Sequence, residues 1–174
     1  MSEFDQLTAA RRRFPVGDRV RGRVSALPFG AGRTGLFVDL GAEPGGFVDV
    51  IHLPDNPGAW PEVGREALFE VLIHRPGQVR LYPLDAGMRS RFYRLSPMSG
   101  EEWAALTRRH PPGSTAIGTV SDVTPGDRTY GVRFDDFHSF VEYDGPPPES
   151  GRTGTYTIVR QLEWTRRILV APVP

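Results

Sequence analysis

The chain has 174 residues, 39% of them hydrophobic, and its 21 basic and 21 acidic side chains give a net charge of zero at pH 7. Zero net charge argues against strong, sequence-independent nucleic-acid binding by the whole surface, because phosphate neutralisation supplies most of that affinity. The lack of cysteine excludes disulfides, thiolate metal sites and a cysteine nucleophile. Without a signal-type N-terminus or a run of about 18 apolar residues, a bacterial cytoplasmic protein is expected, with no membrane partner.

The first predicted element is a short helix over residues 3–13. This segment has few helix breakers and places Phe4, Leu7 and Ala10 on one face at helical spacing. The helix is expected to end before Phe14-Pro15, since the residue that precedes a proline disfavours helical backbone.

Residues 16–82 are predicted to form five short strands. In the first strand Val20, Gly22 and Val24 alternate with three arginines, which is the period of a half-buried strand. Further β-rich runs are separated by glycine and proline turns and by one long crossover; they cover 36–40, 46–51, 67–73 and 78–82. Five short strands with one crossover favour a closed barrel, because closure leaves no unpaired edge.

The order of short motifs in this segment resembles the S-one RNA-binding motif, an OB-fold module first described in a ribosomal protein. The matching residues are Val16-Gly17-Asp18, Gly22-Arg23-Val24, Phe29-Gly30, Phe37 to Gly41, Gly46-Phe47-Val48 and Val63-Gly64. The chain departs from the motif by an insertion at 31–35, and by Asp49 where the family usually has a surface histidine. The resemblance implies an OB barrel that binds RNA.

The candidate site combines positive charge with aromatic rings. Three arginines project from one face of the first strand, where they can follow a phosphate backbone, and two phenylalanines stand where the family presents stacking rings. The predicted nucleic-acid contacts are Arg19, Arg21, Arg23, Phe29, Arg33, Phe37 and His52. The alternatives are an ordinary solvated face for the arginines and a core position for either phenylalanine. Phe47 is expected in the core.

The second half repeats the first in a degenerate form. Residues 84–98 are predicted to be a connector, and a helix over 101–109 is capped by Ser99. Gly17, Gly22 and Val24 then recur at a constant offset of 96, and later blocks recur at 93 and 87, as duplication with loop trimming would leave them. The fold class is therefore expected to be all-β, with two tandem OB-fold five-stranded barrels, each preceded by a short helix, over 1–83 and 99–174.

The second repeat has lost the candidate surface. Thr115, Ile117 and Thr119 replace the arginine row, and Arg133 replaces Phe37. The expected role of this barrel is to set orientation or to dock a protein.

Catalysis, cofactors and metals are not predicted. The four histidines are scattered without metal-ligand spacing, and the polar run from Asp135 to Ser139 is too compact to present a catalytic triad. The leading hypothesis is a non-catalytic protein that binds single-stranded RNA or associates with the ribosome through the first barrel. The alternative is a protein-interaction module, such as an immunity or regulatory partner, that uses the same OB-fold face.

Overall fold

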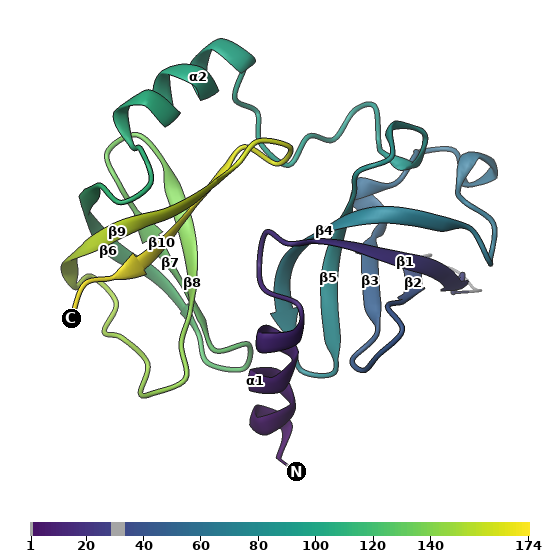
Figure 1. Cartoon of the computed structure of the whole chain (residues 1–174), viewed down its shortest axis with the longest axis horizontal. Helices are drawn as coiled ribbons and strands as arrows, with labels where there is room; N and C mark the ends of the chain where they lie inside the picture. The colour runs from purple at the N-terminus through teal and green to yellow at the C-terminus, as the bar shows by residue number, and fades with distance from the viewer. Residues whose placement is uncertain (1, 29–33) are drawn as a thin grey trace. The chain divides into compact units, whose positions relative to one another are not determined.

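The computed structural model describes residues 2–28 and 34–174, and the chain divides into two compact units, Met1–Arg94 and Leu95–Pro174. Each unit consists of one helix followed by a five-stranded β-sheet (Figure 1). The mainly β fold predicted from the sequence is confirmed. Neither helix has the length and apolar character needed to cross a bilayer, as far as the described residues go.

The first unit is a closed barrel with the strand order β1-β2-β3-β5-β4. All neighbouring strands run antiparallel except β3 and β5, which pair in parallel. Its elements are α1 (Glu3–Arg13), β1 (Arg19–Ala26), β2 (Gly35–Asp39), β3 (Gly46–Asp49), the 3-10 turns η1 (Val50–His52) and η2 (Pro57–Ala59), β4 (Glu66–Arg75), β5 (Gln78–Pro83) and the 3-10 turn η3 (Ala86–Met88).

The core of this barrel requires glycine at two close approaches. Leu36, Val38, Val48, Phe69 and Leu81 fill its centre. A Cβ at Gly46 would overlap the Leu81 side chain, and one at Gly22 would overlap Val38. The glycines of the motif therefore allow the strands to pack tightly around a small barrel interior.

The second unit is an open sheet with the order β10-β9-β6-β7-β8. Its elements are α2 (Gly100–Arg109), β6 (Thr115–Thr124), β7 (Thr129–Arg133), β8 (His138–Glu142), β9 (Thr153–Leu162) and β10 (Arg167–Pro172). The predicted closure of this second barrel is wrong at the level of backbone pairing, because no ladder joins β8 to β10 among the described residues.

A side chain bridges β8 and β10 instead. In the first unit Gly46 pairs with Val79 across the parallel β3–β5 ladder. Ser139 occupies the corresponding place in β8, where its buried hydroxyl donates a hydrogen bond of 2.7 Å to the Ile168 carbonyl of β10. A side chain larger than hydrogen at this crowded position holds the two backbones apart, so the hydroxyl replaces the ladder.

Both helices are attached to their sheets in the same way. Each begins with a capping box, Ser2 with Asp5 in α1 and Ser99 with Glu102 in α2. At the other end the His74 ring donates through Nε2 to the Phe14 carbonyl at 2.8 Å. In the second unit Gln161 Nε2 donates to the His110 carbonyl at 2.8 Å.

The predicted apolar face of α1 is only partly buried. Leu7 and Ala10 are buried as expected, whereas Phe4 is 40% exposed. Phe4 lies in the first turn of α1, and the hydrogen bond that holds the helix to β4 is at its other end.

Candidate nucleic-acid interface

The arginine row lies on the outside of the barrel, as the alternation of β1 predicts. Arg19, Arg21 and Arg23 are exposed, while Gly22 and Val24 are buried. Arg23 donates to Glu66 Oε1 of β4 at 2.8 Å, and this hydrogen bond raises the pKa of Arg23 and lowers that of Glu66.

The other two arginines of the row meet different neighbours in β4. Arg21 lies opposite Leu68, and Arg19 lies opposite Glu70. Within the row Arg23 is hydrogen-bonded to a carboxylate, whereas Arg21 has an apolar residue as its partner in the ladder.

An aromatic pair lies on the same outer surface, on β2 and β3. Phe37 is opposite Phe47 in the ladder, and the two ring centroids are 5.2 Å apart in an edge-to-face arrangement. Phe37 keeps 40% of its surface exposed, whereas Phe47 keeps 5%. Such pairs contribute about 0.5–1.5 kcal/mol beyond their buried area.

Phe47 is buried without belonging to the barrel core, which corrects the expectation from the sequence. The neighbouring Val48 is part of the core, so Phe47 points outward by strand alternation. Gly35 makes room for its ring, because a Cβ on Gly35 would lie 2.7 Å from Phe47 Cζ. The ring is covered by neighbouring side chains of the outer surface rather than by the interior.

Arg80 covers the other side of the Phe47 ring. Its guanidinium carbon lies 4.5 Å from the ring centroid, and Phe47 is opposite Arg80 in the β3–β5 ladder. Arg80 also forms an ion pair of 3.8 Å with Asp49 Oδ2, while Asp49 Oδ1 accepts a hydrogen bond from the Ile51 amide. We call Phe37, Phe47, Asp49 and Arg80 the Phe47 cluster.

Arg80 was not among the contacts predicted from the sequence, although the pattern of β5 indicates its position. Val79 and Leu81 alternate with it in β5, and both are fully buried. Alternation therefore directs the Arg80 side chain outward, beside the outward-facing side chain of the neighbouring strand β3. The negative charge that Asp49 brings to this surface is thus offset by a neighbouring cation.

A shallow hollow of about 140 Å³ adjoins the cluster. Phe47, Asp49 and Arg80 line it together with Ile51 and Ile73. Ile51 is 46% exposed, so this hollow has both an apolar wall and a charged wall.

The other predicted contacts are Phe29, Arg33 and His52. Phe29 and Arg33 lie outside the described residues. His52 is buried, with its ring centroid 5.2 Å from that of Tyr82 and 5.4 Å from that of Tyr93. His52 also lines the hollow beside the Phe47 cluster, so a contact between its ring and RNA stays a prediction.

The corresponding surface of the second unit has a different chemistry. Thr119 lies opposite Thr153 with their hydroxyls 3.2 Å apart, and Ile117 is 70% exposed. Phe140, at the position that corresponds to Phe47, is 58% exposed and packs edge-on against His138. Among the described residues of this surface, threonines and an isoleucine take the place of the arginine row.

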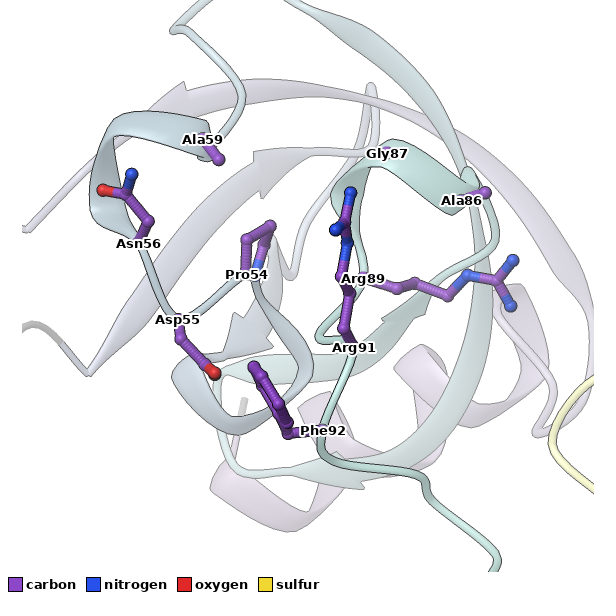
Figure 2. Close-up of a pocket in the computed structure, with 9 residues that line it drawn as sticks. All are labelled: Pro54, Asp55, Asn56, Ala59, Ala86, Gly87, Arg89, Arg91 and Phe92. Atoms are coloured by element: carbon purple, nitrogen blue, oxygen red, sulfur yellow. The ribbon is translucent and has the colours of Figure 1, made fainter.

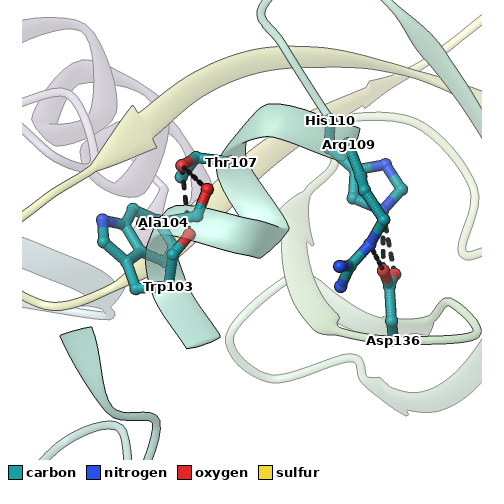
Figure 3. Close-up of polar contacts among 6 residues, drawn as sticks. All are labelled: Trp103, Ala104, Thr107, Arg109, His110 and Asp136. Carbon is teal, nitrogen blue, oxygen red and sulfur yellow. Dashed lines mark hydrogen bonds and ion pairs between the residues drawn. The ribbon is translucent and has the colours of Figure 1, made fainter. Parts of the chain in front are cut away.

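The polar run in the second unit forms an ion-pair cluster (Figure 3). Asp136 accepts from Arg109 Nε at 2.9 Å and from His110 Nε2 at 2.9 Å. Burial raises the pKa of Asp136, but the hydrogen bonds from these two residues outweigh it and hold the pKa below its ordinary value. Ser139 points away to β10, so the run does not assemble a nucleophile with a base.

The chain is similar to known proteins both in sequence and in structure. No family model matches the chain. The chain is 29% identical over 140 residues to small ribosomal subunit protein bS1 of Neisseria meningitidis, a match that covers 76% of this chain and 19% of that protein. The chain thus spans about a fifth of that relative.

Two solved structures are similar at low identity. One is a multidomain protein with nucleic acid binding domains from Streptococcus pneumoniae, at 16% identity and a TM-score of 0.32, covering 90% of this chain and 51% of that one. The other is GSP13 from Bacillus subtilis, at 22% identity and a TM-score of 0.36, covering 51% and 69%. The sequence similarity to bS1 and the closed five-stranded barrel confirm the predicted resemblance, and the first unit is an S-one-like OB fold.

Proposed function

We propose that the first unit binds single-stranded RNA without catalysis, on the outer surface formed by β1, β2, β3 and β5. The Phe47 cluster provides the stacking surface, and the arginine row contacts phosphates. The observation that carries this proposal is Phe37, a ring that is 40% exposed and is supported edge-on by Phe47.

Stacking is the larger expected contribution to affinity. A base stacked on an aromatic side chain is worth about 1–3 kcal/mol, and it requires little sequence preference. The Phe37 ring is already oriented by Phe47, which is itself held beneath the Arg80 guanidinium. Little conformational freedom is then lost when a base stacks on it.

Charge makes a smaller and local contribution. The first unit has 13 arginines and 11 acidic residues (+2), and the second has 8 arginines and 10 acidic residues (−2). Within the first unit β1 carries three arginines, one of which pairs with Glu66, and three more arginines end α1. We therefore expect affinity that depends on salt with a modest slope.

The similarity to a protein of the small ribosomal subunit supports RNA as the partner class. A ribosome-associated form of this function would appear as cosedimentation of the protein with ribosomal particles, reduced by the same substitutions that reduce binding to free RNA.

The test is fluorescence anisotropy with labelled single-stranded RNA of mixed sequence, at low and near-physiological salt. Arg21→Gln with Arg23→Gln should lower the slope of log K against log salt by about 1.4, from about 0.7 for each phosphate contact on a single strand. The matched control is Arg108→Gln with Arg152→Gln, which removes two exposed arginines from the second unit. An absence of RNA binding even at low salt would refute the proposal and direct the search to a protein partner.

A further inference from the structure

A second hollow lies in the first unit, between the crossover within the S-one-like segment and the chain that follows that segment. It has a volume of about 340 Å³ and opens between the crossover after η1 and the segment after η3 (Figure 2). Asp55 and Asn56 line it on the crossover side, and Arg91 and Phe92 line it on the other side. Its size suits a small ligand or one residue of a polymer.

The crossover wall is anchored from beneath. Leu53 and Trp60 are buried on either side of it, and Trp60 Nε1 donates to the Pro54 carbonyl at 2.6 Å. Asn56 Oδ1 accepts from the Gly58 amide at 2.9 Å, and this hydrogen bond caps η2.

The opposite wall is anchored equally well. Met88 of η3 is fully buried in the barrel core. The Ser90 amide donates to the His52 carbonyl at 2.8 Å, and the Ser90 hydroxyl accepts from the amides of Phe92 and Tyr93 at 3.2 and 3.0 Å. Phe92 is 83% exposed, and the segment that carries it is hydrogen-bonded in place.

The lining side chains combine three kinds of contact. Phe92 offers an aromatic face, and Asp55 offers a carboxylate that only accepts hydrogen bonds. Figure 2 shows the Arg91 guanidinium directed along the pocket toward Gly87, whereas that of Arg89 points away from the other lining residues. A stacking face, one cation and one acceptor match the base, the phosphate and the donor edge of a nucleotide.

We propose that this pocket binds one nucleotide of the RNA, with the base stacked on Phe92, a phosphate on Arg91 and the donor edge of the base on Asp55. This proposal rests on the proposed function of the first unit and adds a base-selective site to it. We call it the Phe92 pocket.

Guanine is the base whose hydrogen-bond donors match the Asp55 carboxylate best. Its pairing edge carries two adjacent N–H groups, which can each donate to one oxygen of the Asp55 carboxylate. Uracil presents a single N–H between two carbonyl oxygens, and these oxygens would face the carboxylate unfavourably. The Phe92 pocket therefore predicts a preference for guanine in an otherwise sequence-tolerant RNA.

The Phe92 pocket lies close in the chain to the Phe47 cluster. Asp49 of the cluster caps η1, and Pro54 at the edge of the pocket follows the end of η1 by two residues. Tyr93, next to Phe92, packs against His52 of η1. One RNA strand can therefore reach both places.

The first experiment titrates the full chain, labelled with 5-fluorotryptophan, with guanosine and uridine monophosphates and follows fluorine NMR. Trp60 reports the pocket wall through its bond to Pro54, and Trp103 and Trp164 of the second unit are internal controls. The expected result is a shift of the Trp60 resonance, stronger with the guanosine nucleotide. Unchanged Trp60 with both nucleotides would overturn the proposal.

The second experiment separates this proposal from the proposed function. Two labelled RNAs are compared by anisotropy, a uridine 12-mer and the same 12-mer with one central guanosine. Asp55→Asn and Phe92→Ala should lower affinity for the guanosine RNA by about 5-fold or more and leave the uridine 12-mer within twofold. Glu62→Gln removes another exposed carboxylate from the same unit and should change neither.

The outcomes are distinguishable. A guanosine preference that survives both pocket substitutions overturns the Phe92 pocket, while RNA binding that is lost in Phe37→Ala continues to support the outer surface. If neither RNA binds the wild-type chain, the proposed function fails, and the inference that rests on it fails with it. Phe92 is almost fully solvent-exposed, so its truncation leaves the fold intact.

Discussion

The most direct prediction concerns Phe37, because its ring has both a packed side and an exposed side. Replacing it with leucine keeps most of the apolar contact with Phe47 and removes the aromatic face. The loss of one stacked base, about 1–3 kcal/mol, corresponds to a 5- to 150-fold weaker affinity for single-stranded RNA. Phe37→Trp should bind at least as well as the wild type.

The free energy of unfolding distinguishes the packing role of Phe37 from its role in base stacking. Full burial of a phenylalanine contributes about 1.5–3 kcal/mol, and with 40% exposure Phe37 realises about 1–2 kcal/mol of it. The edge-to-face pair adds about 0.5–1.5 kcal/mol. Phe37→Ala should therefore lower the free energy of unfolding by about 1.5–3.5 kcal/mol, whereas Phe37→Leu should lose less than about 1.5 kcal/mol.

The assay for Phe37 combines anisotropy with urea unfolding, followed by the fluorine resonance of Trp60 to isolate the first unit. Phe140→Ala, which truncates an exposed aromatic ring of the second unit, is the matched control and should leave RNA affinity unchanged. If Phe37→Leu binds RNA as well as the wild type while remaining folded, Phe37 is not a stacking platform and the proposed surface is incorrect.

Three further predictions concern packing and pH. Gly46→Ala should destabilise the first unit by about 1–3 kcal/mol, because its methyl group overlaps Leu81, whereas Gly87→Ala, which meets no atom within 4 Å, should be neutral in the same urea experiment. Ser139→Ala should cost the second unit about 1–3 kcal/mol by removing the bridge between β8 and β10, and amide hydrogen exchange should accelerate in β10. The folded pKa of Asp136 lies below its ordinary value of 3.8, so its stabilisation is complete above that pH and is lost as pH falls through the folded pKa. Below pH 4 the free energy of unfolding of Asp136→Asn should change less with pH than that of the wild type. If the two change equally, the ion-pair cluster of Asp136 is not the cause of the acid sensitivity.

The duplication was visible in the sequence because each repeat keeps the same backbone contacts. The Gly17 amide donates to the Val71 carbonyl at 2.8 Å, and the Gly113 amide donates to the Ile158 carbonyl at 2.8 Å. These glycines have φ angles of 86° and 88°, which other residues rarely adopt. The constant offset between corresponding glycines therefore reflects the same backbone conformation in both units.

The candidate site was only partly predictable. Alternation within β1 placed the arginine row on the outside, since one strand is enough to define a period of two, whereas Phe37 was placed by the resemblance alone. Phe47 was expected in the core because it precedes the polar Asp49 by two positions in an alternating strand. Its burial depends on Arg80 and Phe37, which come from two other strands.

The sequence by itself determined the helix limits, the strands and the S-one-like barrel of the first unit, because these depend on periodicity, capping and turn residues that act within a few positions. Only the tertiary structure decided that Arg80 covers Phe47, that His52 is enclosed by two tyrosines, and that β8 meets β10 through a serine hydroxyl. The Phe92 pocket likewise joins residues about 35 positions apart, which no local pattern brings together. Contacts of this kind depend on how strands close around a core, and that closure is a property of the whole unit.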